Sequence, residues 1–226
     1  MVKAKKSLSQ NFLIDKNISK KITNLTNIEN KIILEIGPGY GFLTDNILEK
    51  NPKKIFLIEK DFILKDLLDR KYKNNKKVII FCKDILQFSL NEFKNLIIIS
   101  NLPYNISSEI ILYLFKFHHN IDEMILMIQK EQSIKYDYNL PKMNKYKFIT
   151  KIVTQFTRCF DVSSKVFIPR PKVTSSVVKF VMNKNNIDFD KLNKFSNLIF
   201  KNVRKKISNN IKYKLNNELM NKRVNE

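Results

Sequence analysis

Short apolar runs, rich in β-branched residues, recur along the first part of the chain and alternate with amphipathic stretches. The apolar runs lie at 30–37, 52–59, 76–84, 95–101 and 123–130. The amphipathic stretches lie at 42–50, 61–72 and 107–117. Continuous apolar runs of this kind are typical of buried parallel strands, and the stretches between them of helices. The alternation predicts a doubly wound α/β sheet that binds ligands at the carboxyl ends of its strands.

The pattern changes after residue 156. Two β-rich runs, 159–167 and 173–182, flank a proline-containing loop, and they predict antiparallel strands that complete the sheet. From about residue 184 the chain becomes polar and helical, and it ends in a basic tail. We therefore expect a mostly parallel, seven-stranded, Rossmann-like domain over 1–183 and a small, basic helical domain over 184–226.

All three glycines of the chain, Gly37, Gly39 and Gly41, lie in one loop between a predicted strand and a predicted helix. A strand-to-helix turn at this place needs backbone conformations barred to larger residues, and it leaves the main chain open to a ligand. The spacing E-x-G-x-G-x-G brings the third glycine one position earlier than in a dinucleotide-binding motif. The loop resembles the cofactor loop of S-adenosylmethionine-dependent methyltransferases. A turn that needs glycine only for its shape is the alternative.

Two carboxylates follow the next two predicted strands. Glu59 ends the second strand, where an acid can accept both hydroxyls of a ribose. Asp84 follows the third, where a carboxylate can receive the amino group of an adenine. Either acid alone could be a helix cap or a surface residue. Three successive strands that each end at a suitable group predict an adenosyl-binding site.

The sequence Asn-Leu-Pro-Tyr ends the fourth predicted strand and matches a pattern of methyltransferases that act on exocyclic amines of nucleobases or on amide nitrogens. Such a nitrogen is a poor nucleophile because its lone pair is delocalised. The Asn101 side-chain oxygen and the Leu102 carbonyl could accept its hydrogens and draw it toward tetrahedral geometry. Pro103 would stiffen the turn, and Tyr104 would stack on an unpaired or flipped-out base. A strand-ending turn with a buried tyrosine is the alternative.

Seven motifs cover nearly the whole chain in one order: SQNFL, EIGPGYG, IEKD, NLPYNIS, MIQKE, FIPRPKVTSSVV and VRKKI. Together they resemble the KsgA family, the small-subunit (16S) rRNA adenine dimethyltransferases. The resemblance implies the class I methyltransferase fold and S-adenosyl-L-methionine as the cofactor. It also implies dimethylation of two adjacent adenines in a hairpin loop near the 3′ end of the rRNA. The implied partner is a partly assembled 30S subunit, and we expect the protein to be a monomer.

The resemblance also implies roles for individual residues. The residues expected to cover or contact the cofactor are Asn11, Leu13, Gly37, Gly39, Glu59, Asp84 and Asn101. Phe167 would stack on the target adenine opposite Tyr104, unless it is a core aromatic before a proline turn. In the VRKK segment, Arg204, Lys205 and Lys206 would contact rRNA phosphates, unless they form a solvated helix face.

The chain departs from the family at three places. Ser9 stands where relatives usually have glycine, and 146–148 read Tyr-Lys-Phe where relatives have Tyr-Gly-Arg. The C-terminal domain is also shorter than in relatives. Because that domain helps to place the enzyme on the ribosome, substrate positioning is less firmly implied than cofactor binding.

Composition agrees with a nucleic-acid partner. The chain has 42 Lys and Arg against 21 Asp and Glu, a net charge of +21. A coding sequence biased toward A and T could also supply the lysines. Cys82 and Cys159 are isolated, and no Cys/His cluster surrounds the two histidines, so we expect reduced thiols and no metal site. The apolar runs are too short to cross a bilayer and no secretory signal is visible, so we expect a cytoplasmic protein without membrane contact.

Two other functions remain open at this stage. Related enzymes dimethylate an adenine in large-subunit (23S) rRNA and confer macrolide resistance, but they usually lack the NIS that follows Asn-Leu-Pro-Tyr here. A ribosome-assembly or transcription factor could keep the fold without the chemistry. The intact sequence from Asn101 to Tyr104 favours an enzyme.

Overall fold

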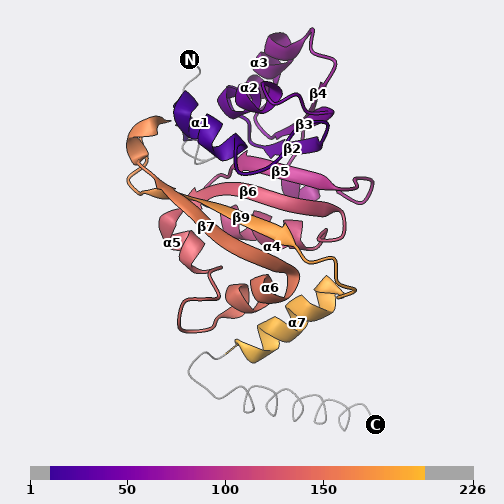
Figure 1. The fold of residues 1–226 in the computed structure, drawn as a ribbon, viewed down its shortest axis with the longest axis vertical. Coiled ribbons are helices and arrows are strands. Elements are labelled where there is room, and N and C mark those ends of the chain that lie inside the picture. The colour runs from indigo at the N-terminus through magenta and orange to yellow at the C-terminus, as the bar shows by residue number, and fades with distance from the viewer. Residues whose placement is uncertain (1–10, 202–226) are drawn as a thin grey trace.

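A seven-stranded sheet forms the centre of the part of the chain that the computed structural model describes, residues 11–201 (Figure 1). Its strand order is β4-β3-β2-β5-β6-β9-β7. The strands are β2 (Ile32–Ile36), β3 (Lys54–Glu59), β4 (Val78–Cys82), β5 (Leu96–Asn101), β6 (Ile121–Gln129), β7 (Thr154–Val162) and β9 (Ser175–Met182). Strands β2 to β6 are parallel, and β9 runs antiparallel between β6 and β7. The expected parallel strands and the closing antiparallel pair are confirmed.

Helices cover both faces of this sheet, because successive strand residues point to opposite faces and both sets are apolar. The helices of one face are α1 (Lys16–Thr23), α2 (Phe42–Leu48) and α3 (Phe62–Tyr72). Those of the other face are α4 (Ser107–Phe115), α6 (Lys145–Val153) and α7 (Phe189–Ile199), and the short α5 (Lys130–Ile134) follows β6. In Figure 1 the first group occupies the upper part of the molecule and the second group the lower part.

Two sequence-based expectations about strands are wrong in detail. The run 76–84 was expected to be buried, but β4 is an edge strand paired only with β3, and its side chains are half-buried or exposed. The run 159–167 is not one strand, since β7 ends at Val162 and a 3-10 turn, Ser164–Val166, follows. The ladder of β7 begins earlier than expected, at Thr154, directly after α6.

A second, two-stranded sheet joins the N-terminal segment to the segment that follows β7. β1 (Phe12–Leu13) pairs antiparallel with β8 (Phe167–Ile168), so that Leu13 lies opposite Phe167. The Ile14 N–H donates to the Val166 carbonyl at 3.0 Å and extends the contact. This pairing places the N-terminal segment across the carboxyl ends of the parallel strands.

Helix α7 packs on the sheet domain rather than standing apart from it. Its Phe189 and Leu192 belong to the same core cluster as α4 and α6. The expected boundary at residue 183 stays a prediction, because most of the C-terminal region lies outside the described residues. Between residues 11 and 201, no helix combines the length and the apolar character needed to cross a membrane.

Candidate active site

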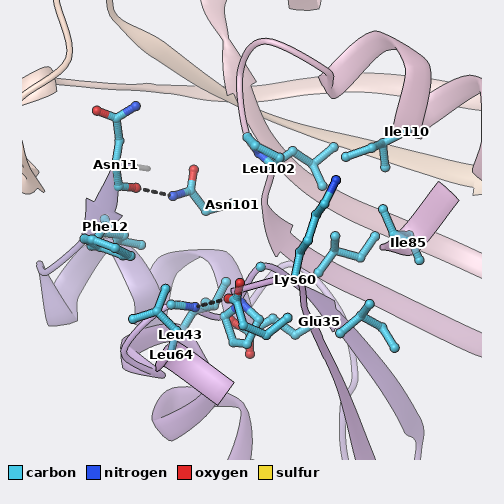
Figure 2. Close-up of a pocket in the computed structure, with 18 of the residues that line it drawn as sticks. Asn11, Phe12, Glu35, Leu43, Lys60, Leu64, Ile85, Asn101, Leu102 and Ile110 are labelled. Carbon is cyan, nitrogen blue, oxygen red and sulfur yellow. Dashed lines mark hydrogen bonds between the residues drawn. The ribbon is translucent and has the colours of Figure 1, made fainter. Parts of the chain in front are cut away.

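A cavity lies at the carboxyl ends of the parallel strands, beside the N-terminal strand β1 (Figure 2). The residues that line it include Asn11, Leu13, Gly37, Gly39, Glu59, Asp84, Asn101, Leu102, Pro103 and Tyr104. All ten were singled out from the sequence. Those that follow the parallel strands are brought together because the carboxyl ends of neighbouring parallel strands meet at one edge of the sheet, and the N-terminal segment adds Asn11 and Leu13. Apolar side chains such as Ile58, Leu64 and Ile85 complete the wall.

The glycine loop between β2 and α2 has the left-handed backbone that its composition predicted. The φ angles of Gly37, Gly39 and Gly41 are +63°, +59° and +77°. A Cβ on Gly39 would lie 2.6 Å from the ring of Phe12. That ring packs edge-on against Tyr40, with 4.6 Å between the two ring centroids. A Cβ on Gly37 would meet nothing within 4 Å, so this glycine borders open space in the cavity wall. The loop is therefore closed by Phe12 on one side and open to a ligand at Gly37.

Glu59 connects the end of β3 to the glycine loop. One carboxylate oxygen accepts a hydrogen bond from the Asp61 N–H at 2.9 Å, and the other accepts from the Gly39 N–H at 3.3 Å. The side chain is buried, and burial raises its pKa above the ordinary value despite these two donors. Each oxygen retains a further lone pair that can accept a hydroxyl.

Asp84 lies at the mouth of the cavity, where it also caps the 3-10 turn Ile85–Gln87. One oxygen accepts from the Leu86 N–H at 3.0 Å, and the other pairs with Lys60 Nζ at 2.8 Å. Partial burial favours the neutral acid, but the Lys60 ammonium and the Leu86 N–H outweigh it and hold the pKa of Asp84 below its usual value. Asp84 therefore fits both interpretations of the sequence, since it caps a turn and also lines the cavity.

The amide of Asn101 is fixed in one orientation by the N-terminal segment. Its Nδ2 donates to the backbone carbonyl of Asn11 at 2.8 Å, as the dashed line in Figure 2 shows. Its Oδ1 is buried and has no hydrogen-bond partner within residues 11–201. An unpaired buried acceptor costs about 1–3 kcal/mol, so this oxygen marks a place where a donor is missing. Sequence reasoning assigned Asn11 to the cofactor but did not foresee that its carbonyl orients Asn101.

Of the three residues after Asn101 that were assigned to chemistry, Leu102 and Tyr104 are held by hydrogen bonds. The Leu102 N–H donates to the Met127 carbonyl at 3.1 Å, which ties the turn to β6. Tyr104 is 7% exposed, and its hydroxyl lies 2.5 Å from Ser175 Oγ. Burial raises the pKa of Tyr104 above its ordinary value, and the hydrogen bond with Ser175 offsets only part of that effect.

Glu35 is a cavity residue whose environment was not foreseen. It is 2% exposed, and its Oε2 accepts a hydrogen bond from Thr44 Oγ1 at 2.6 Å. Burial raises the pKa of this carboxyl to about 8, and the hydrogen bond from Thr44 offsets only part of that effect. The one sequence feature that could have drawn attention to Glu35 is its position as the first residue of E-x-G-x-G-x-G.

Among the assigned residues between 11 and 201, Phe167 is the one that does not line the cavity. Its ring is 2% exposed in the core cluster that contains Leu13, Val162 and Val177. It does not line the cavity beside Tyr104. The three tail cations, Arg204, Lys205 and Lys206, lie outside the described residues. Within the described chain, no group of three His, Cys, Asp or Glu side chains could hold a metal ion.

Comparison with known proteins decides the class of this site. A family model described as ribosomal RNA adenine dimethylase matches residues 1–226. The chain belongs to the ribosomal RNA adenine dimethylase family. This dimethylase is 39% identical over 217 residues to ribosomal RNA small subunit methyltransferase A of Pelagibacter ubique, covering 90% of the chain and 81% of that protein. It is 40% identical over 214 residues to the protein of the same name from Mycoplasmopsis synoviae, covering 91% and 81%.

Two solved structures share the fold of the dimethylase. The 23S rRNA methyltransferase ErmE has a TM-score of 0.76 at 20% identity, covering 90% of this chain and 84% of that one. A dimethyladenosine transferase from Plasmodium falciparum has a TM-score of 0.74 at 24% identity, covering 84% and 71%. The fold is the class I methyltransferase fold, and the protein is an S-adenosylmethionine-dependent rRNA methyltransferase.

Proposed function

We propose that this dimethylase transfers methyl groups to two adjacent adenines in a hairpin loop near the 3′ end of small-subunit rRNA. The similar curated proteins are named for the small subunit, at 34–40% identity. The likeness to the 23S enzyme ErmE lies below 25% identity and extends to the fold alone. The observation that carries the chemistry is the buried, unpaired Oδ1 of Asn101 in the cavity wall.

The residues of the cavity fit S-adenosylmethionine. Open space beside Gly37 leaves room for a ligand against the main chain, and Glu59 retains lone pairs for ribose hydroxyls. Asp84 at the cavity mouth can accept from the adenine amino group, beside the apolar side chain of Ile85. Asn11 and Leu13 of the N-terminal segment would cover the cofactor. When bound, the cofactor supplies a methyl group on a positively charged sulfur.

The residues at the end of β5 would activate the target amine. Asn101 Nδ2 donates to the Asn11 carbonyl, so Oδ1 is the atom left to accept a hydrogen bond from an N–H of the amine. The Leu102 carbonyl is the second proposed acceptor. Hydrogen bonds from both N–H groups to these acceptors localise the nitrogen lone pair. They stabilise the tetrahedral nitrogen of the transition state more than the planar nitrogen of the bound adenine. Pro103 stiffens the turn, and Tyr104 offers its ring to an unpaired base.

The wider interactions belong to the same proposal. The partner would be a partly assembled 30S subunit, met in the cytoplasm by a monomer of the dimethylase. Arg204, Lys205 and Lys206 would contact rRNA phosphates from the basic C-terminal domain over 184–226. The two relatives named above are 39% and 40% identical and are named for the small subunit, which supports the RNA partner.

Mass spectrometry of adenosines tests the proposal. Small and large subunits that lack dimethyladenosine would be incubated with S-adenosylmethionine and either the wild-type protein or the Asn101→Ala variant. Dimethyladenosine in the small-subunit RNA with wild type alone supports the proposal. Dimethyladenosine in the large-subunit RNA would support the macrolide-resistance reaction instead, and none in either RNA would support a non-catalytic factor.

A further inference from the structure

Tyr104 is held by hydrogen bonds at its backbone and at the tip of its side chain. Its backbone carbonyl accepts a hydrogen bond from Ser107 Oγ, at the start of α4, at 3.2 Å. Its hydroxyl lies 2.5 Å from the Oγ of Ser175, the first residue of β9. With the backbone and the phenol oxygen both fixed, the axis of the ring between them has one direction, and the ring has one place beside the cavity.

Ser175 is itself a rigid anchor. It pairs with Gln129 of β6 and Val162 of β7, so it lies between two strands of the sheet. The preceding residue, Thr174, accepts a hydrogen bond from the Lys130 N–H at 3.0 Å. Ser175 is 0% exposed, and a hydroxyl buried without a partner would cost about 1–3 kcal/mol. The contact with Tyr104 satisfies both hydroxyls.

Ser175 does not line the cavity, whereas Tyr104 does. Any effect of Ser175 on chemistry must therefore pass through the tyrosine. We propose that Ser175 is a positioning residue for methyl transfer: by holding the Tyr104 hydroxyl, it fixes the place in the cavity wall of the ring on which the target adenine stacks. This inference rests on the proposed function, and it links the loop after β5 to the strand that follows the proline-containing loop.

The adjacent residue supplies a matched control. Ser176 is also 0% exposed and lies in the same strand, but its Oγ donates to Asp161 Oδ1 at 2.6 Å and has no contact with Tyr104. Ser175→Ala and Ser176→Ala therefore remove the same group from the same buried strand. They differ in whether the lost hydrogen bond reaches the cavity.

Single-turnover methylation, at saturating S-adenosylmethionine and subunit, would be measured for Ser175→Ala, Tyr104→Phe, the double variant and Ser176→Ala. The RNA is that of whichever subunit the wild-type protein methylates. Ser175→Ala and Tyr104→Phe should each lower the rate about three- to tenfold, the range for one neutral hydrogen bond. The double variant should be no slower than the slower single variant within about twofold, because both substitutions break one bond. Ser176→Ala should keep the wild-type rate within about twofold.

Calorimetry of S-adenosylmethionine binding should show unchanged affinity in all four variants, which separates positioning of the base from damage to the cofactor site. If Ser175→Ala does not fold, Tyr104→Phe removes the same bond from the other side and carries the test. A wild-type rate in Tyr104→Phe or Ser175→Ala, or losses that multiply in the double variant, would overturn the inference alone. A wild-type protein that methylates neither subunit would refute the proposed function, and this inference with it.

Discussion

The Glu35→Gln substitution should stabilise the folded protein, and the gain should grow as the pH rises. Glu35 is 2% exposed in the cavity wall, and burial raises its pKa from 4.5 to about 8. Thr44 lowers the pKa and Asp45 raises it, but both effects are smaller than that of burial. Glutamine has nearly the same shape, stays neutral, and offers an oxygen to the Thr44 hydroxyl. It therefore keeps the hydrogen bond and removes the titration.

The magnitude follows from the two pKa values. Between pH 4.5 and about 8, the folded state keeps a proton on Glu35 that the unfolded state has released. The free energy of unfolding must therefore fall as the pH rises through this window and level off above it. At about 1.36 kcal/mol per pKa unit, the full effect is about 5 kcal/mol, of which about 3 kcal/mol falls between about pH 5.5 and 8.5.

Urea unfolding of wild type and Glu35→Gln across this pH range measures the effect. Burial also raises the pKa of Glu59, but Glu59 is present in both proteins, so the difference between them isolates Glu35. Glu92→Gln, at an exposed position, is the control for the loss of a surface carboxylate. A stability difference that stays constant between about pH 5.5 and 8.5 would refute the reasoning, because it would mean that Glu35 titrates normally in the folded state.

Three further predictions concern the reaction and the partner. Asn101→Ala should lower the single-turnover methylation rate about 10²–10³-fold with subunit binding nearly intact, and a rate within about threefold of wild type would contradict its role. Glu59→Ala should weaken S-adenosylmethionine binding by about 1.5–3 kcal/mol, measured by calorimetry. Unchanged affinity in a folded variant would mean that Glu59 does not contact the cofactor and serves only to hold the glycine loop. Replacing the three tail cations by glutamine should reduce the slope of log affinity for the subunit against log salt concentration by up to about three charge units. An unchanged slope would mean that these cations do not contact phosphates. Those cations are Arg204, Lys205 and Lys206.

The parallel sheet could be predicted from the sequence because its strands are buried on both faces and therefore read as continuous apolar runs. The same signal overstated the burial of β4, since an edge strand can be as apolar as a central one. Glu59, Asp84 and Asn101 were predictable because each lies at or just after the end of a strand, and the ends of neighbouring parallel strands meet at one edge. Asn11 and Leu13 were implied only by the family resemblance. The helices α5 and α6 were not predicted: α5 is only 5 residues long, and α6 runs directly into β7 without a turn between them.

The interactions among the cavity residues were not predictable in the same way. The Asn11 carbonyl that orients Asn101, and the Ser175 hydroxyl that holds Tyr104, come from segments 90 and 71 positions away. No spacing in the sequence indicates such a contact. The raised pKa of Glu35 likewise depends on burial, which the identity of a residue does not determine.

Phe167 shows how such a long-range contact decides the place of a single ring. The resemblance to the KsgA family implies a Phe167 ring beside the target adenine, opposite Tyr104, with a core aromatic as the alternative. In the structure, the pairing of β8 with β1 sets Phe167 opposite Leu13 and buries the ring. The same strand β1 carries Phe12 against Gly39 and Leu13 into the cavity wall, so the pairing that builds this wall also withdraws Phe167. Stacking of Phe167 on a base would therefore require its ring to leave the core cluster that it shares with Leu13, Val162 and Val177.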